Sequence, residues 1–179
     1  SSNSQMILYG RYMLYFDKLF DFEEKLNKIK PVWVELGLQT TNENTARCIN
    51  RGYENLCYFD AVKRLKSAGL EVVTHIIIGL PNETKEDILK TIDFAVKCKT
   101  DGVKLQLLHI HKGTDLYEDY KKGLVKPLSL DEYMDILFAC IERIPENIVI
   151  HRITGDAPKS LLVEPLWSGD KKRVLNAIH

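Results

Sequence analysis

Five side chains able to bind a ligand or move a proton lie within or after apolar runs of the sequence: Gln39, Arg51, His75, His109 and His111. An amide donates and accepts hydrogen bonds, a guanidinium pairs with a carboxylate, and an imidazole exchanges protons or binds metal. Each also has a structural interpretation, as a cap, a surface ion pair or a hydrogen-bonded core histidine. We expect the two neighbouring histidines to alternate, so that only one faces inward, which makes them a weak metal pair.

The four cysteines lack the spacing of a metal site. Cys48, Cys57, Cys98 and Cys140 are 9, 41 and 42 residues apart, whereas zinc and iron–sulfur sites usually contain a close pair joined by a short turn. We therefore expect free thiols in a reducing compartment and no metal ligands.

Buried strands must position these side chains. Near-continuous apolar, β-branched runs are typical of strands that are covered on both faces, which favours a parallel sheet. Four runs have this character, at residues 32–38, 72–78, 103–110 and 148–153.

Helical segments separate the strands, so that the expected order is α-β-α-β-α-β-α-α-β-α. Helices are predicted over about 16–29, over 58–68 (ended by Gly69), over 85–97 (capped by Thr84 and Asp87), over 129–144 (opened by Ser129) and from about Asp170. The strands begin 40, 31 and 45 residues apart, close to the roughly 31 residues of a (β/α)-barrel unit. Four strands cannot close a barrel, so the sheet is open or part of a larger one.

Composition excludes some classes of protein. Lys plus Arg and Asp plus Glu both number 25, so net charge gives no signal for nucleic-acid binding. No apolar run approaches the roughly 20 residues of a membrane span, and the chain does not open with a secretory signal. We expect a cytoplasmic protein without a membrane partner.

Several strings of residues, in order, resemble the radical S-adenosylmethionine (SAM) superfamily. They are Glu-Leu-Gly-Leu-Gln-Thr-Thr with Ile-Asn-Arg-Gly (35–41 and 49–52), Val-Thr-His-Ile-Ile-Ile-Gly-Leu-Pro-Asn-Glu-Thr (73–84), Leu-His-Ile-His-Lys-Gly-Thr (108–114), His-Arg-Ile-Thr-Gly-Asp-Ala-Pro (151–158) and Pro-Leu-Trp-Ser (165–168). The resemblance is to bacterial Elp3/MiaB/NifB-like iron–sulfur oxidoreductases. It implies an α/β fold, part of a (β/α)6 barrel from its fourth strand onward.

The resemblance also implies a [4Fe–4S] cluster and SAM, whose reductive cleavage yields a 5′-deoxyadenosyl radical. The family's Cys-x3-Cys-x2-Cys loop is missing here. We therefore expect a C-terminal fragment of such an enzyme, inactive alone and binding no cofactor by itself.

The resemblance assigns nine residues to SAM. It implies that Gln39 binds the methionine or ribose part, Arg51 the carboxylate and His75 the ribose, and that the adenine lies between Ile77, Gly79, Leu80 and Pro81 on one side and His109 and Ile110 on the other. No residue is assigned to catalysis or to metal.

Three regions are expected: an unassigned stretch (1–15), the half-barrel (16–154) and a C-terminal extension packing on it (155–179). An unpaired edge at the first predicted strand would favour self-association, unless residues 6–16 cover it as a strand or helix.

Two other functions stay open. One is a metal-independent (β/α)-barrel enzyme of aldolase or phosphate-binding type, with Lys104 or Lys112 as the reactive amine. The other is a non-catalytic interaction module that presents Arg51, His151 and Arg152 to an acidic partner. The substrate stays open too, because family members act on tRNA, proteins and small metabolites.

Overall fold

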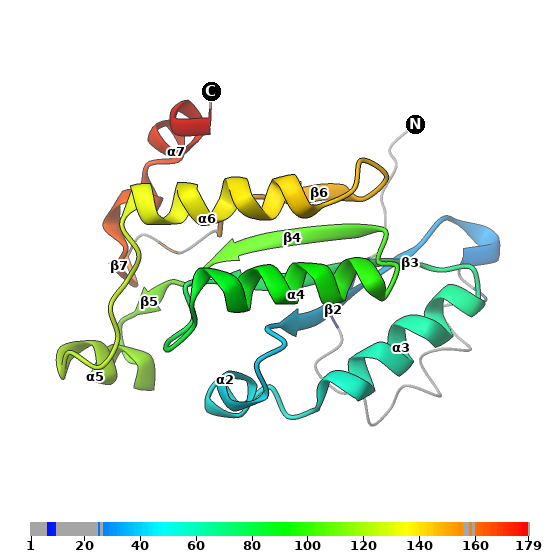
Figure 1. Cartoon of the computed structure of the whole chain (residues 1–179), viewed down its shortest axis with the longest axis horizontal. Helices are drawn as coiled ribbons and strands as arrows, with labels where there is room; N and C mark the ends of the chain where they lie inside the picture. The colour runs from blue at the N-terminus through cyan, green and yellow to red at the C-terminus, as the bar shows by residue number, and fades with distance from the viewer. Residues whose placement is uncertain (1–6, 10–24, 26, 156–157, 159, 179) are drawn as a thin grey trace.

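A parallel five-stranded sheet forms the centre of the computed structural model, which describes residues 7–9, 25, 27–155, 158 and 160–178 (Figure 1). Its strands lie in the order β1 (Ile7–Tyr9), β2 (Trp33–Gln39), β3 (Glu71–Ile78), β4 (Gly102–Leu107) and β6 (Val149–Arg152). A separate antiparallel pair joins β5 (Ile110–His111) to β7 (Leu162–Glu164). All neighbours in the main sheet are parallel, so their carboxyl ends meet at one edge.

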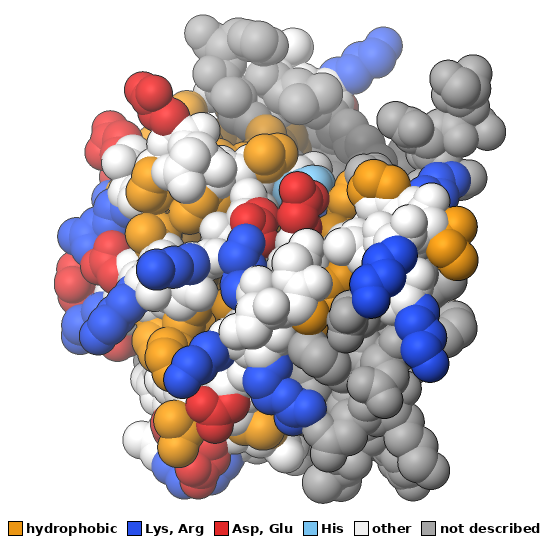
Figure 2. Space-filling model, turned by 90° about the vertical axis from the view of Figure 1, so that its right-hand side faces the viewer, with side chains coloured by type: hydrophobic (Ala, Val, Ile, Leu, Met, Phe, Trp, Pro, Cys, Tyr) orange, Lys and Arg blue, Asp and Glu red, His pale blue; other side chains and the backbone are white. Residues whose placement is uncertain are grey.

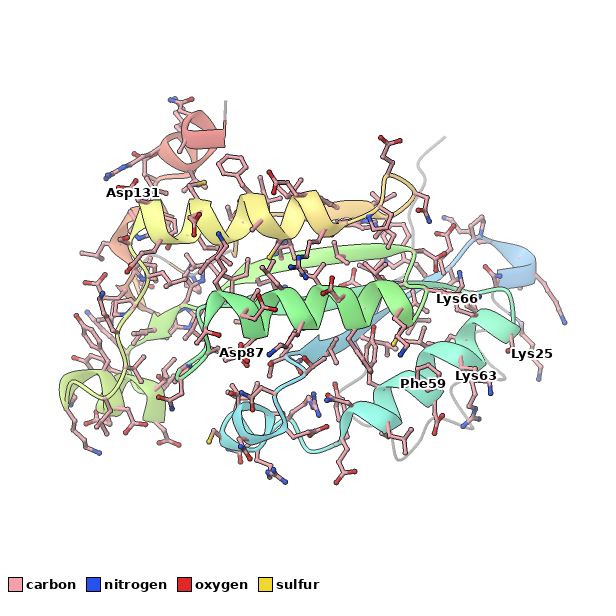
Figure 3. All side chains as sticks on the ribbon, viewed as in Figure 1. Lys25, Phe59, Lys63, Lys66, Asp87 and Asp131 are labelled. Carbon is pink, nitrogen blue, oxygen red and sulfur yellow. The ribbon has the colours of Figure 1, made fainter. Side chains whose placement is uncertain are left out.

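Helices α3, α4 and α6 cover one face of this sheet (Figure 1). The helical segments are α2 (Glu43–Cys48), α3 (Asn55–Ser67), α4 (Lys85–Lys97), α5 (Asp115–Lys121), α6 (Leu130–Arg143), the 3-10 turn η2 (Leu166–Gly169) and α7 (Lys171–Ile178). Capping boxes begin α4 at Thr84 and α6 at Ser129. Asp87 and Asp131 therefore lie near the carboxyl edge of the sheet, in the first turns of these helices (Figure 3).

The two faces of the sheet differ in chemistry. On the helix side, alternate residues such as Val34, Leu36 and Ile76 are buried in the apolar core. The intervening positions, which point to the other face, include Glu35 and His75. The covered face therefore stabilises the fold, while the opposite face carries polar groups.

The four predicted strands and three central helices are confirmed, with two corrections. The third strand does not run to residue 110: β4 ends at Leu107, and Ile110 begins β5 because it pairs with β7 instead. Helix α3 begins at Asn55 rather than 58. Of the helix predicted over 16–29, residues 25 and 27–29 are helical and the rest lies outside the described residues.

Of the two alternatives for the edge of the first predicted strand, cover by a strand from residues 6–16 is confirmed for residues 7–9. Ile7–Tyr9 pairs in parallel with residues 33–35 of β2, so β1 covers the amino half of this edge. The proposed self-association therefore loses that part of its physical basis.

Charged side chains of both signs are mixed on the face seen in Figure 2, which agrees with the balanced composition. Among the described residues, no helix is long and apolar enough to cross a membrane.

Candidate functional site

A cavity of about 1450 Å³ lies beyond the carboxyl ends of β2 and β3. Its walls come from the turns that follow these strands, from the segment after β4, and from α5. Its lining includes Gln39, Cys48, Asn50, Arg51, Cys57, Ile77, Leu80, Pro81, Asn82 and Leu108. Ligands of parallel α/β sheets bind at this edge, so the cavity is the first candidate site.

Strained backbone gathers at this cavity. Gln39, Asn50 and Asn82 have φ values of +56°, +54° and +63°, and all three line it. Non-glycine residues rarely adopt this left-handed conformation, and such strain clusters at functional sites. Gly79 also has a positive φ, +92°, and a Cβ there would lie 3.0 Å from Leu128. The turn after β3 therefore requires glycine at this position.

Gln39 lines the cavity but folds back over its own strand. With its amide oriented to satisfy its hydrogen bonds, the nitrogen donates to the carbonyl oxygens of Gly37 at 2.8 Å and Leu38 at 3.2 Å. The amide oxygen is then the part of this side chain that can accept a hydrogen bond from a ligand.

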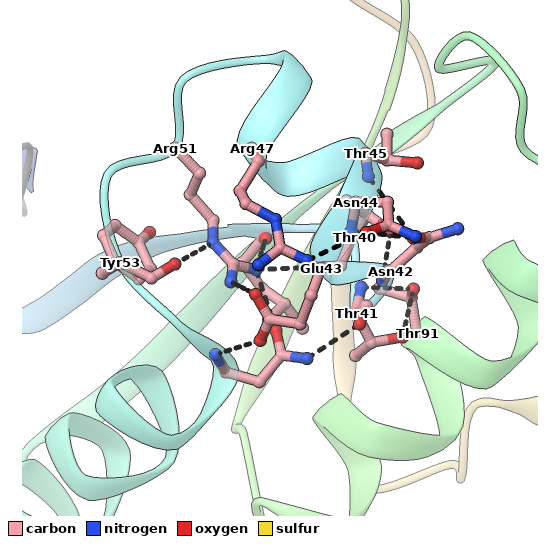
Figure 4. A network of polar contacts seen from close by, with 12 residues as sticks. Thr40, Thr41, Asn42, Glu43, Asn44, Thr45, Arg47, Arg51, Tyr53 and Thr91 are labelled. Atoms are coloured by element: carbon pink, nitrogen blue, oxygen red, sulfur yellow. Dashed lines mark hydrogen bonds and ion pairs between the residues drawn. The ribbon is translucent and has the colours of Figure 1, made fainter.

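Arg51 binds the loop around it rather than facing open space (Figure 4). Its Nε donates to the carbonyl oxygen of Tyr53 at 2.7 Å, NH1 to that of Thr40 at 2.7 Å, and NH2 to Oε2 of Glu43 at 3.0 Å. Its side chain is only 1% exposed. These contacts do not support a direct bond from Arg51 to the carboxylate of SAM, or a role in an exposed surface for an acidic partner.

A buried charged cluster occupies the sheet face opposite the helices. Oε1 of Glu35 lies 2.5 Å from Nζ of Lys104, and Oε2 lies 2.6 Å from Nε2 of His75. The side chain of Glu35 is fully buried. Burial acts to raise the pKa of Glu35, but hydrogen bonds from Lys104, His75 and Trp33 outweigh it and hold the pKa below its ordinary value. Glu35 is therefore ionised, and Lys104 is not a free amine for an aldolase.

His75 belongs to this cluster and lines neither cavity. Its Nδ1 lies 3.3 Å from Nε2 of Gln106, so both ring nitrogens have protein partners. Burial lowers the pKa of His75 despite the opposing effect of Glu35. The contact between His75 and the ribose of SAM is therefore not supported by this geometry.

A smaller cavity of about 260 Å³ lies beside the first and shares Ile77 and Leu108 with it. Its remaining lining residues are Gln106, Leu107, His109, His111, Arg152 and Gly155. Both histidines line it, with ring centroids 6.0 Å apart. The expectation that only one faces inward was wrong, because residues two apart in an extended chain point the same way.

The nine residues assigned to SAM thus fall into three groups. Five line the large cavity (Gln39, Arg51, Ile77, Leu80 and Pro81), and His109 lines the small one. His75, Gly79 and Ile110 line neither, and Ile110 is buried in β5. Sequence reasoning missed Glu35 and Gln106, and it considered Lys104 only as the reactive amine of an alternative enzyme. Their alternation with apolar residues in β2 and β4 was the available signal.

The cysteines do not fit a [4Fe–4S] cluster. Cys98 and Cys140 are buried, and burial raises their pKa values to about 11 and about 12. Cys48 and Cys57 are exposed and line the large cavity. Within the described ranges, no group of three or more His, Cys, Asp or Glu residues could hold a metal ion.

A parallel sheet with helices on one face and a ligand-sized cavity at its carboxyl edge is typical of a (β/α)-barrel protein. Residues 13–95 match the model of the Radical SAM superfamily, and residues 100–179 match that of the Radical_SAM C-terminal domain. The chain belongs to the radical SAM superfamily.

Among curated relatives, YtqA of Bacillus subtilis is 40% identical over 163 residues, which cover 91% of this chain and 51% of YtqA. YhcC of Escherichia coli K12 is 36% identical over 136 residues, covering 76% of this chain and 44% of YhcC. The chain thus spans about half the length of these relatives. Elongator complex protein 3 of Dictyostelium discoideum is 30% identical over 144 residues, which cover 79% of this chain and 26% of that protein.

Two solved structures share the fold. Elp3 of Methanocaldococcus infernus has a TM-score of 0.79 and 24% identity, covering 97% of this chain and 41% of Elp3. SuiB of Streptococcus suis bound to S-adenosylmethionine has a TM-score of 0.55 and 16% identity, covering 83% of this chain and 39% of SuiB.

Proposed function

We propose that this chain forms the SAM-binding part of a cytoplasmic radical SAM oxidoreductase, with SAM in the large cavity. One observation carries the proposal: Gln39, Leu80 and Pro81, which the sequence resemblance assigns to SAM, line one cavity at the carboxyl edge of the sheet. Membership of the superfamily and the fold shared with SAM-bound SuiB support it.

Each wall of the cavity would make a different contact. Ile77, Leu80 and Pro81 are apolar and would pack against the adenine ring, while Gly79 gives the turn its shape. Leu108, which lines the cavity from the segment after β4, would close the other side of the adenine pocket, a place that His109 and Ile110 do not reach in this cavity. The amide oxygen of Gln39 would accept a hydrogen bond from the ribose or methionine part of SAM.

Arg51 would act as a positioning residue. It joins the carbonyl oxygens of Leu38 and Thr40, on either side of Gln39, to Glu43 and Tyr53. In this role Arg51 fixes the left-handed backbone of Gln39 and with it the orientation of the amide.

In this superfamily, SAM bound to a [4Fe–4S] cluster supplies a 5′-deoxyadenosyl radical. The described cysteines do not fit such a cluster, so this chain is assigned the binding of SAM and no step through the cluster. The whole protein's substrate, a small metabolite or tRNA, is a separate proposal.

Calorimetric titration of the full chain with SAM tests this function. Leu108→Trp would place a larger side chain in the wall of the cavity, and Leu161→Trp is the matched control because Leu161 is exposed and lines neither cavity. The sequence predicts no cofactor binding by this chain alone, but the cavity leads us to expect weak SAM binding by the wild type. We expect at least tenfold weaker binding by Leu108→Trp and no change in the control. Absence of binding by the wild type, or equal binding by both variants, would overturn the proposal.

A further inference from the structure

Gln106 joins the small cavity to the buried charged cluster. It lines the cavity from β4, and its Nε2 lies 3.3 Å from Nδ1 of His75. Its amide oxygen, Oε1, has no hydrogen-bond partner among the residues that the structure describes, and this oxygen is not fully buried. The amide therefore has one end tied to His75 and one end available to the cavity.

The charged cluster determines whether the amide nitrogen or the amide oxygen of Gln106 faces His75. The Glu35 carboxylate only accepts hydrogen bonds, so Nε2 of His75 must carry the proton that it shares with Glu35. In a neutral imidazole, Nδ1 is then an acceptor. Only the amide nitrogen of Gln106 can donate to it, which leaves the carbonyl oxygen facing the cavity.

We propose that Gln106 is a specificity-determining residue of the small cavity, whose carbonyl oxygen selects a substrate group that donates a hydrogen bond, such as a hydroxyl or an amide N–H. Ile77, Leu107 and Leu108 supply apolar walls around this acceptor. The substrate class rests on the proposed function, but the orientation of Gln106 does not.

Protonation of His75 would reverse this selectivity. Nδ1 would then carry a proton. The Gln106 amide would have to rotate so that its oxygen accepts a hydrogen bond from this N–H group and its NH2 group faces the cavity. Among the residues that the structure describes, Glu35 on β2, Lys104 on β4 and Arg152 on β6 are charged groups that act on His75. Burial, together with the charges of Lys104 and Arg152, lowers the pKa of His75 against the effect of Glu35. The acceptor orientation therefore holds at neutral pH.

NMR titration of the full chain without cofactors tests the orientation. The Gln106 side-chain amide signals are identified by their loss in Gln106→Leu, and the imidazole signals of His75 by their loss in His75→Phe. We expect both sets to shift with one common midpoint. Lys104→Met should raise that midpoint and Glu35→Gln should lower it, because they remove a repelling and an attracting charge. Gln106 signals that do not follow His75 would overturn the proposed coupling.

A matched pair of probes tests the selectivity. Propionamide carries an N–H donor, and N,N-dimethylpropionamide lacks one. At pH 8 we expect propionamide to perturb the signals of Ile77 and Gln106 more strongly, and we expect this preference to disappear below the His75 midpoint. Gln106→Glu, which keeps an acceptor, should retain the preference, and Gln106→Leu should lose it.

The co-titration of Gln106 with His75 and the preference for propionamide are both independent of the radical chemistry. Equal responses to both probes in the wild type would overturn the selectivity even if SAM binds as proposed. Conversely, failure of SAM to bind would leave the predicted probe preference and co-titration unchanged.

Discussion

Nζ of Lys104 lies 2.5 Å from Oε1 of Glu35, although β3 separates their strands in the sheet. The two side chains reach across β3 on the face opposite the helices and meet beside His75. Because the carboxylate of Glu35 is fully buried, Lys104 and His75 take the place of water around it. The ion pair thus connects three strands through side chains, in addition to their backbone hydrogen bonds.

Lys104→Met should destabilise the fold strongly, because it leaves a buried carboxylate without its cation. Breaking one side of a buried pair costs about 3–5 kcal/mol. Urea denaturation at pH 7 measures this loss. The double variant Glu35→Leu, Lys104→Met removes both charges and should recover most of it. Equal losses in the single and double variants would contradict the pairing.

The same pair predicts acid sensitivity. The folded-state pKa of Glu35 lies below its unfolded value, for which the ordinary value is 4.5. Its stabilising effect is therefore present above about pH 4.5 and is lost as pH falls through the folded-state pKa. Denaturation measured at several pH values should show a smaller acid-dependent loss in Glu35→Gln than in the wild type.

Glu83 should show the opposite dependence. Burial raises its pKa, and hydrogen bonding from Thr40 offsets this only in part. The free energy of unfolding should therefore fall as pH rises from about 4.5 through the folded-state pKa. Glu83→Gln keeps the acceptor for Thr40 and removes the buried charge, so we expect it to be at least as stable as the wild type at pH 8. Strong destabilisation by this variant would show that the charged form is required.

Arg51→Lys should destabilise the loop after β2, although the charge is kept. A lysine cannot reproduce the planar set of donors that reaches Thr40, Glu43 and Tyr53. We expect a loss of about 2–4 kcal/mol, since several buried acceptors lose partners at about 1–3 kcal/mol each. Arg47→Lys is the matched control, because Arg47 lies in the exposed last turn of α2 and its guanidinium donates to the side chain of Asn44. A similar loss in both variants would argue against a special role for Arg51.

Gly37→Ala should change the position of Gln39 more than it changes stability. A Cβ at residue 37 would overlap the terminal amide of Gln39, the flexible end of a side chain that can move. We expect a stability change below about 1 kcal/mol, together with weaker SAM binding in calorimetry. In a Gln39→Ala background, Gly37→Ala should have no further effect on binding. An additional loss there would mean that Gly37 acts independently of Gln39.

The sequence predicted the elements with strong local signals. Both capping boxes and the apolar periodicity of α4 and α6 determine these helices from neighbouring residues alone. The end of β4 depends instead on a distant partner: Ile110 leaves the main sheet because it pairs with Glu164, which no local pattern reveals.

The site was predicted less completely, for a related reason. Residues in the turns after β2 and β3 could be assigned to a site from the sequence, and Gln39, Leu80 and Pro81 do line one cavity. Arg51 was recognised as a charged side chain near this edge, but its contacts could not be predicted from the sequence. Its five acceptors lie in three separate parts of the chain, on Leu38 and Thr40, on Glu43, and on Tyr53 and Asn55. Glu35 and Lys104 are 69 residues apart, so only the register of three strands brings them together.

The parallel order of the main sheet has a consequence for folding kinetics. In the described strands, Trp33 pairs with Glu71, Val73 with Gly102, and Gly102 with Val149, so no pairing closes as a local hairpin. Two neighbouring strands can pair only after the helical segment between them has returned the chain to the same side of the sheet. The cooperative folding unit is therefore a strand, its helix and the next strand, and the fold has a high contact order despite its many helices.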